Sequence, residues 1–300
     1  MDTQAQRLFR YLQINYELWP MRKLLVPLFT ILLSISLIGQ TPIKVMTYNI
    51  RYDNPNDGEN HWELRKRWLA NQINFIEPDV LGIQEGLAHQ VTFLEDALPT
   101  YNHIGVGRDD GKEAGEYTAI FYKSENLELI NQNTFWLSET PEKPSVGWDA
   151  ALERICTYAL FQHKVTNQKF WVFNTHFDHV GDTARANSVD LITTEIRKLN
   201  MENLPVFLMG DLNLEPDSEP IQKLSSRMND ARHYSTDLVF GPKGTFNGFK
   251  HNEPVTRRID YIFTNPYKVE VRKYAVLSDS KDKKYPSDHL PVVVEAILKQ

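Results

Sequence analysis

Val206-Phe207-Leu208-Met209-Gly210-Asp211-Leu212-Asn213 is a short apolar run that ends in a glycine and two polar residues. A run of this length before a turn residue is typical of a buried strand, which delivers Asp211 and Asn213 to the edge of a sheet. In α/β proteins that edge often holds the chemistry. Because side chains alternate along a strand, both are expected on one side of it. They either cap a turn, as Asp and Asn commonly do, or act together on one atom.

The composition is that of an ordinary globular protein with a large core, since 41% of its 300 residues are hydrophobic and 24% are charged. We find no internal repeat, low-complexity tract or Ser/Gly-rich linker after residue 41. Residues 41–300 are therefore expected to form one domain. Cys156 is the only cysteine, so stability must come from packing rather than from an internal disulfide.

The first forty residues have a different character. Met21-Arg22-Lys23 precedes an uncharged, mostly apolar stretch from Leu24 to Ile38, which predicts a secretory signal peptide over 21–40. Residues 1–20 are then an upstream misreading or an N-terminal extension, with an uncleaved membrane anchor as the alternative. The expected location is secreted or periplasmic, as a monomer without stable membrane insertion after cleavage.

The charge balance argues against a non-specific nucleic-acid binder. Residues 1–40 carry four basic and two acidic side chains, so their removal takes the formal net charge from −6 to −8. A nuclease whose metal ion supplies the local positive charge stays compatible with this balance. The acidic balance favours a phosphorylated small molecule or a short nucleic acid as the partner; a phospholipid headgroup is a further expected partner that the charge does not by itself indicate.

Hydrophobic periodicity predicts alternating helices and strands, hence mixed sheets covered by helices. Residues 53–58 and 138–149 are rich in turn-forming residues and are expected to be loops. The helices are predicted over 62–76, 90–98, 185–199 and 219–228. The strands are predicted over 43–50, 80–85, 101–106, 117–122, 127–137, 155–163, 169–175, 204–212, 258–264, 269–277 and 290–298.

Polar residues stand at or beside the ends of several predicted strands, as in the opening stretch. Each has a plain structural explanation alone, as a turn, a helix cap or a surface ion pair, but their repetition favours one shared site. Carboxylates and amides suit a hard cation such as Mg²⁺ or Mn²⁺, and histidines suit acid/base work. Metal-assisted hydrolysis of a phosphate ester follows. The residues are Asn49, Glu85, His176, Asp211, Asn213, Asp260, Asp288 and His289.

Six segments, in order, resemble the motifs of the endonuclease/exonuclease/phosphatase family with the deoxyribonuclease I-like fold. The resemblance covers about residues 43–298 and implies an α/β, four-layer sandwich of two packed mixed β-sheets flanked by helices. The segments are Thr47-Tyr48-Asn49-Ile50-Arg51, Ile83-Gln84-Glu85, Asn174-Thr175-His176, Gly210-Asp211-Leu212-Asn213, Arg258-Ile259-Asp260-Tyr261-Ile262 and Ser287-Asp288-His289-Leu290-Pro291-Val292.

The resemblance also implies roles for these residues. Glu85 is the principal metal ligand, with Asn49 and Asp288 close to the ion. Asp211 orients or deprotonates the attacking water, Asn213 holds the phosphate or that water, and His176 donates to a phosphate oxygen. His289, oriented by Asp260, stabilises the transition state or acts as the base. Tyr117 resembles the phosphate-contacting tyrosine of the family.

Substrate choice is assigned to the loops and to nearby basic and aromatic residues. Arg51, Arg154 and Arg185 are the basic candidates; Arg154 either forks onto a phosphate or pairs with an acid such as Glu153. Trp148 stacks on a base or sugar, or folds back on its own domain. His179 is either substrate-facing or structural. The half-match of residues 176–179 to a metallo-β-lactamase zinc motif is weaker, because position 174 is Asn.

Three functions remain open from the sequence. The first is hydrolysis of a phosphodiester by water attack, in a nuclease or a small-molecule phosphodiesterase. The second is a phosphomonoesterase acting on a sugar, inositol or nucleotide phosphate. The third is a non-catalytic binding protein with the same fold, which predicts a damaged catalytic position that this sequence does not show.

Overall fold

A computed structural model describes residues 42–299 of the chain. The predicted signal peptide at 21–40 and the extension at 1–20 lie outside the described residues. Within residues 42–299, no helix is both long and apolar enough to cross a membrane. The rest of this section concerns the domain that begins at Pro42.

The first sheet has seven strands in the order β10-β12-β13-β1-β2-β4-β3. Its centre is β1, which pairs parallel with β2 and antiparallel with β13, so the sheet is mixed. Both neighbours of β1 are apolar along nearly their whole length, as expected for strands covered on both faces. The strands are β1 (Ile43–Asn49), β2 (Val80–Gln84), β3 (Tyr101–Ile104), β4 (Ile120–Lys123), β10 (Leu238–Phe240), β12 (Val269–Val276) and β13 (Val292–Leu298).

The second sheet has six strands in the order β5-β6-β7-β8-β11-β9, and β8 is the strand of the opening stretch. It is also mixed, because β7 and β8 run parallel while β8 and β11 run antiparallel. The strands are β5 (Leu127–Trp136), β6 (Ile155–His163), β7 (Lys169–His176), β8 (Val206–Asp211), β9 (Asn229–Asp230) and β11 (Asp260–Thr264).

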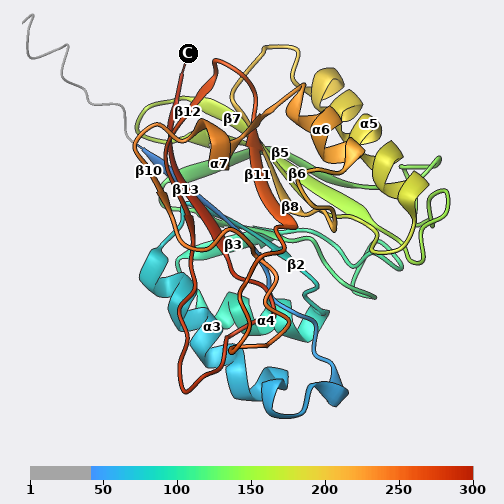
Figure 1. Cartoon of the computed structure of the whole chain (residues 1–300). Helices are drawn as coiled ribbons and strands as arrows, with labels where there is room; N and C mark the ends of the chain where they lie inside the picture. The colour runs from blue at the N-terminus through green and yellow to red at the C-terminus, as the bar shows by residue number, and fades with distance from the viewer. Residues whose placement is uncertain (1–41, 300) are drawn as a thin grey trace, which may run out of the picture. The chain divides into compact units, whose positions relative to one another are not determined.

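Helices cover the outer face of each sheet, which gives four layers (Figure 1). One apolar core fills the space between the sheets, a second lies under α5 and α6, and a third lies under α3 and α4. Each helix buries only one stripe of side chains, as amphipathic helices do. The helices are α3 (Trp62–Ile76), α4 (Ala88–Ala97), α5 (Asp182–Leu199), α6 (Glu219–Ser225), α7 (Ala231–Tyr234) and the 3₁₀ helix η1 (Pro55–Asn60).

A polar seam interrupts the apolar core between the two sheets, close to the ends of β1, β2 and β7. Asn174 on β7 donates from Nδ2 to the carbonyls of Ile83 and Ala119, both at 2.9 Å. Gln84 on β2 donates from Nε2 to Asn174 Oδ1 at 2.6 Å. The sheets approach closely here because position 82 is Gly, where a Cβ would lie 2.7 Å from the Asn174 side chain. The Asn174 amide is therefore satisfied at both its nitrogen and its oxygen, whereas Oε1 of Gln84 is buried without a partner.

The predicted four-layer fold is confirmed, with helix α3 at its predicted bounds and most strands within two residues of theirs. The predicted strand over 117–122 begins later, because Tyr117 makes only isolated bridges to Gly86 and Gly107. The 3₁₀ helix η1 begins within the loop expected over 53–58, with Pro55 in its first turn, and continues to Asn60. Three short elements were not predicted, namely β9, α7 and β10.

Candidate active site

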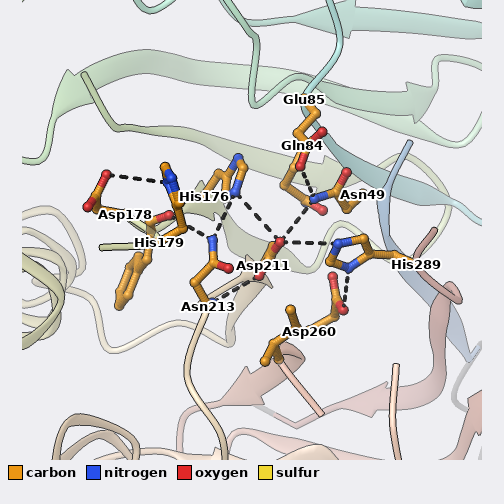
Figure 2. Close-up of polar contacts among 12 residues, drawn as sticks. Asn49, Gln84, Glu85, His176, Asp178, His179, Asp211, Asn213, Asp260 and His289 are labelled. Carbon is orange, nitrogen blue, oxygen red and sulfur yellow. Dashed lines mark hydrogen bonds and ion pairs between the residues drawn. The ribbon is translucent and has the colours of Figure 1, made fainter. Parts of the chain in front are cut away.

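Strand register brings the residues of the site together at one end of both sheets. In the second sheet His176 is opposite Asp211, and Asp211 is opposite Asp260. In the first sheet Asn49 is opposite Gln84, the residue before Glu85. Figure 2 shows the Asp211 carboxylate in the middle, with dashed lines from it to His176, Asn49 and His289.

Asp211 caps a turn and also lies in the candidate site, where the Asn213 side chain contacts His176, so the two explanations of the opening stretch are compatible. Asp211 Oδ1 accepts from the Asn213 backbone N–H at 2.9 Å, an Asx turn. The sharp end of β8 requires Gly210, which has φ 144° and passes so close to β7 that a Cβ would lie 1.9 Å from the Thr175 carbonyl oxygen. The glycine is therefore a backbone requirement of the site.

A group of acidic and imidazole side chains could hold a metal ion. Ligand atoms of Glu85, Asp211 and His289 all lie within 4.8 Å of one another. Asn49 joins the carboxylates, because its Nδ2 donates to Glu85 at 2.8 Å and to Asp211 at 2.9 Å. Carboxylate oxygens in this number fit a divalent cation of the Mg²⁺ type. Asp288 lies beside the group, and burial raises its pKa to about 6, with the Glu85 charge adding to the effect.

His289 and Asp260 form a buried dyad next to Asp211. His289 Nδ1 lies 2.9 Å from Asp260 Oδ2, and its Nε2 lies 3.7 Å from Asp211 Oδ2. Burial opposes a charge on this ring, but the carboxylates of Asp260 and Asp211 hold the pKa of His289 well above its usual value. Burial, together with the Asp260 charge, raises the pKa of Asp211 to about 7. Such a carboxyl is suited to take up a proton near neutral pH.

His176 has the opposite electrostatic character. It is buried, and this burial together with the positive charges of Arg154 and Arg108 holds the pKa of His176 well below its usual value. Its Nε2 lies 3.1 Å from Asn213 Nδ2 and 3.6 Å from Asp211 Oδ2. One site thus contains a histidine that favours a positive charge and another that stays neutral.

The residues predicted to contact the substrate do not all lie at the site. Arg51 is 22% exposed at the rim, where it binds Asp57 and lies 3.9 Å from both Glu85 and Asp288. Arg185 pairs with Asp182 in the first turn of α5 and has no contact with the catalytic group.

The loop that carries Trp148 is anchored to the start of α5. Its backbone N–H binds Glu139, and the next residue, Asp149, accepts from the backbone N–H of Thr183 and Ala184 at the start of α5. Trp148 itself has a left-handed backbone, with φ 50°, and is partly exposed.

The polar groups of Arg154 and Tyr117 are bonded to other residues of the protein. Arg154 is 4% exposed, and its nearest acid is Asp178 at 3.3 Å rather than Glu153. This burial is against the expectation that Arg154 forks onto a substrate phosphate. The Tyr117 hydroxyl donates to the Lys112 carbonyl at 2.9 Å, and the ring lines the same small recess as His176.

Several supporting residues were not found from the sequence. Arg108 and Glu116 form a two-bonded ion pair at 2.7 and 3.1 Å, and Glu116 lies 3.8 Å from His176 Nδ1. They come from a loop without regular spacing, so no sequence pattern indicates them. Asp57, which orients Arg51, stands in the predicted loop before α3 and could have been suspected only from its charge.

Comparison with known proteins defines the class. The Endonuclease/Exonuclease/phosphatase family matches residues 46–289, and the chain belongs to this family. It is therefore a divalent-metal phosphoester hydrolase, and the alternative of a non-catalytic binding protein is set aside.

Particular relatives add detail. A mannosyl-6-phosphatase of Bacteroides thetaiotaomicron superposes with a TM-score of 0.82 at 38% identity, covering 85% of this chain and 100% of that one. An uncharacterised mimivirus protein is 28% identical over 78% of this chain and 91% of its own length. The Ccr4 exoribonuclease subunit of Kluyveromyces lactis is 24% identical over 77% of this chain, but only 37% of that protein is matched.

Proposed function

We propose that the chain removes the phosphate from a phosphorylated sugar, a phosphate monoester, by attack of water. The similarity to the mannosyl-6-phosphatase carries this proposal, because at 38% identity it spans the whole of that chain. The order reverses the expectation from the sequence, in which a phosphodiester came first. The acidic chain, with a net charge of −6, also suits a small substrate better than a polynucleotide.

The arrangement of side chains supports this chemistry. Asp211, which accepts hydrogen bonds from Asn49 and Asn213, would take a proton from the attacking water as the water oxygen bonds to phosphorus. The phosphorus–oxygen bond to the sugar then breaks, and the sugar oxygen takes up a proton in place of the one that Asp211 received, so that the alcohol leaves and Asp211 is restored. Asn213 and His176 would donate to the phosphoryl oxygens, and the protonated His289 would stabilise the charge that develops there.

Glu85 and Asp211, with Asp288 beside them, would hold Mg²⁺ or Mn²⁺, which when bound stabilises negative charge on the phosphoryl group. Arg51, which lies 3.9 Å from both Glu85 and Asp288, would meet the substrate from the metal side. We also propose action outside the cytoplasm, supported by the basic start and apolar stretch in residues 21–40.

The test measures product formation with Mg²⁺ on the chain from residue 41: inorganic phosphate from the sugar phosphates, and p-nitrophenol or shortened fragments from the two diesters. The substrates are mannose 6-phosphate, glucose 6-phosphate, bis-p-nitrophenyl phosphate and a short oligonucleotide. We expect release from the sugar phosphates, with loss of at least about 10³-fold in kcat for Asp211→Ala. Equal rates for parent and variant, or activity that survives a chelator, would contradict the proposal.

A phosphodiesterase is the second candidate, because the Ccr4 relative is named an exoribonuclease. The same assay separates the two candidates. Cleavage of the diesters with the sugar phosphates left intact would favour this second function and exclude the first.

A further inference from the structure

Arg154, just before β6, places one buried guanidinium against two imidazole rings. Its Nη1 lies 3.1 Å from His176 Nδ1, and its Nη2 lies 2.9 Å from His179 Nδ1. Its Nε lies 3.3 Å from Asp178 Oδ1. Figure 2 shows these two histidines and Asp178 side by side, on the side of Asp211 away from His289. Each edge of the guanidinium is therefore used within the protein.

The chemistry of these groups determines where the ring protons are. A guanidinium carries only N–H donors and keeps its charge in proteins, so an imidazole nitrogen at 3.1 Å from it must accept. Nδ1 of His176 therefore has no proton, and the neutral ring carries its proton on Nε2. The same reasoning applies to His179, whose side chain is 53% exposed.

The proton on His176 Nε2 then faces a second donor. Asn213 Nδ2 lies 3.1 Å from Nε2, and the same amide nitrogen donates to the Phe177 carbonyl at 3.1 Å, which sets the orientation of the amide. Two N–H groups thus meet without an acceptor between them, and the nearest oxygen, Asp211 Oδ2, is 3.6 Å from Nε2. Two converging donors of this kind are prepared to receive an anionic oxygen.

We propose that Arg154 is a positioning residue that fixes the Nε2–H tautomer of His176, so that His176 and Asn213 donate together to one phosphoryl oxygen. The identity of that oxygen rests on the proposed function, whereas the tautomer does not. Arg154 is itself held by Asp178, which also accepts from the backbone N–H of Val180 at 2.9 Å and of Gly181 at 2.7 Å.

The surroundings also predict what happens without Arg154. Glu116 Oε2 lies 3.8 Å from His176 Nδ1, on the same side as the guanidinium. With Arg154 removed, Glu116 is the nearest charged group to Nδ1 and draws the proton there. Nε2 then becomes an acceptor for the Asn213 amide, and the pair of converging donors is lost. The ring keeps its place but changes its function.

The test is nuclear magnetic resonance of the chain with ¹⁵N-labelled histidine, above neutral pH and without metal. Long-range proton–nitrogen correlation distinguishes the two tautomers, and His176→Asn and His179→Asn assign the two rings. We expect Nε2–H for both rings in the parent. In Arg154→Met we expect the His176 proton to move to Nδ1 in a large fraction of molecules.

Arg258→Met is the matched control, because Arg258 is 2% exposed and pairs with Asp230 but contacts neither ring. It is expected to leave both tautomers unchanged. Arg154→Lys serves where the Met variant fails to fold, since a single ammonium cannot bind both rings in the same geometry. A parent with the proton on Nδ1, or an unchanged His176 tautomer in Arg154→Met and Arg154→Lys, would overturn the proposal.

A second measurement uses inorganic phosphate and the Mg²⁺-loaded enzyme. We expect phosphate to shift the His176 Nε2–H signal of the parent and to bind about 10-fold more weakly to Arg154→Lys, roughly the loss of one charge-assisted hydrogen bond. Unchanged phosphate affinity together with a changed tautomer would contradict the paired-donor role. Because neither readout needs turnover, an error in the proposed substrate leaves both results interpretable.

Discussion

Replacing Asp211 with Asn should stabilise the metal-free protein, and the gain should grow with pH. Asp211 is 1% exposed, and its strand partner is the equally buried Asp260. Burial, then the Asp260 charge, raises the pKa of Asp211 from 3.8 to about 7. The ionised side chain therefore opposes folding, and the amide of Asn has the same shape without the charge.

The size of the effect follows from the pKa difference. The shift of about three units between the unfolded and folded states corresponds to at most about 4 kcal/mol, at about 1.4 kcal/mol per unit. Because the folded-state pKa is the higher one, this stability is fully present below about pH 4 and is lost as the pH rises through about 7. Asn lacks this dependence, so its advantage over Asp211 should increase across the same range.

Urea unfolding in the presence of a chelator, from about pH 4 to about pH 8, measures this difference. Asn can still accept the Asn213 backbone N–H, while its amide hydrogens meet those of Asn49. That local cost is independent of pH, so the change in the stability difference is the diagnostic quantity. The exposed Asp217→Asn is the control. A stability difference that is flat or decreases with pH would refute the reasoning.

Three further results are expected. Mg²⁺ at about 100 times its Kd should stabilise the parent by about 2.7 kcal/mol in thermal unfolding, and Glu85→Gln should remove most of that gain. Asp260→Asn should lower kcat by about 10² to 10⁴-fold with little change in KM, because it removes the carboxylate that orients His289 and favours its positive charge. An unchanged kcat in steady-state assays would exclude this role. Gly210→Ala should cost at least about 3 kcal/mol in urea unfolding, since the new methyl would overlap the Thr175 carbonyl.

These results need two controls. Gly58 also has a positive φ, at 55°, but has no atom within 4 Å of an added Cβ. Gly58→Ala should therefore cost only about 1 kcal/mol, the price of the backbone conformation. A Glu63→Gln variant, altered at an exposed helix position, should keep the full response to Mg²⁺. Similar losses in both glycine variants would show that steric overlap at Gly210 is not the cause.

Much of the fold could be predicted because its strands are complete apolar runs with polar ends. The strand predicted over 155–163 and the helix predicted over 62–76 begin and end at those residues in the structure. β9 and β10 could not be found in this way. The two residues of β9 are too short to show a period, and the three residues of β10 are all exposed, so each is defined only by the strand beside it.

The sequence indicated which residues would gather at the site, but not which of their side chains would favour a charge. Asp211 and His176 could be expected at one sheet edge, because each ends an apolar strand. The contrast between His176 and His289 depends on groups brought near by the fold, such as Arg108, which lies 68 positions before His176 in the chain. For the same reason Arg154 pairs with Asp178 rather than with its neighbour in sequence. Burial decides both outcomes, and burial belongs to the folded structure.

The polar seam between the sheets also has a mechanical consequence. Glu85 and Asn49 belong to one sheet, whereas His176 and Asp211 belong to the other. Apolar faces alone could slide past each other with little loss, but a slide of one residue would separate Asn174 from all its partners, at about 1–3 kcal/mol for each buried group. The hydrogen bonds of the seam therefore oppose sliding of one sheet over the other. They keep a constant distance between the site residues of one sheet and those of the other, while the sequences of the surrounding loops can change.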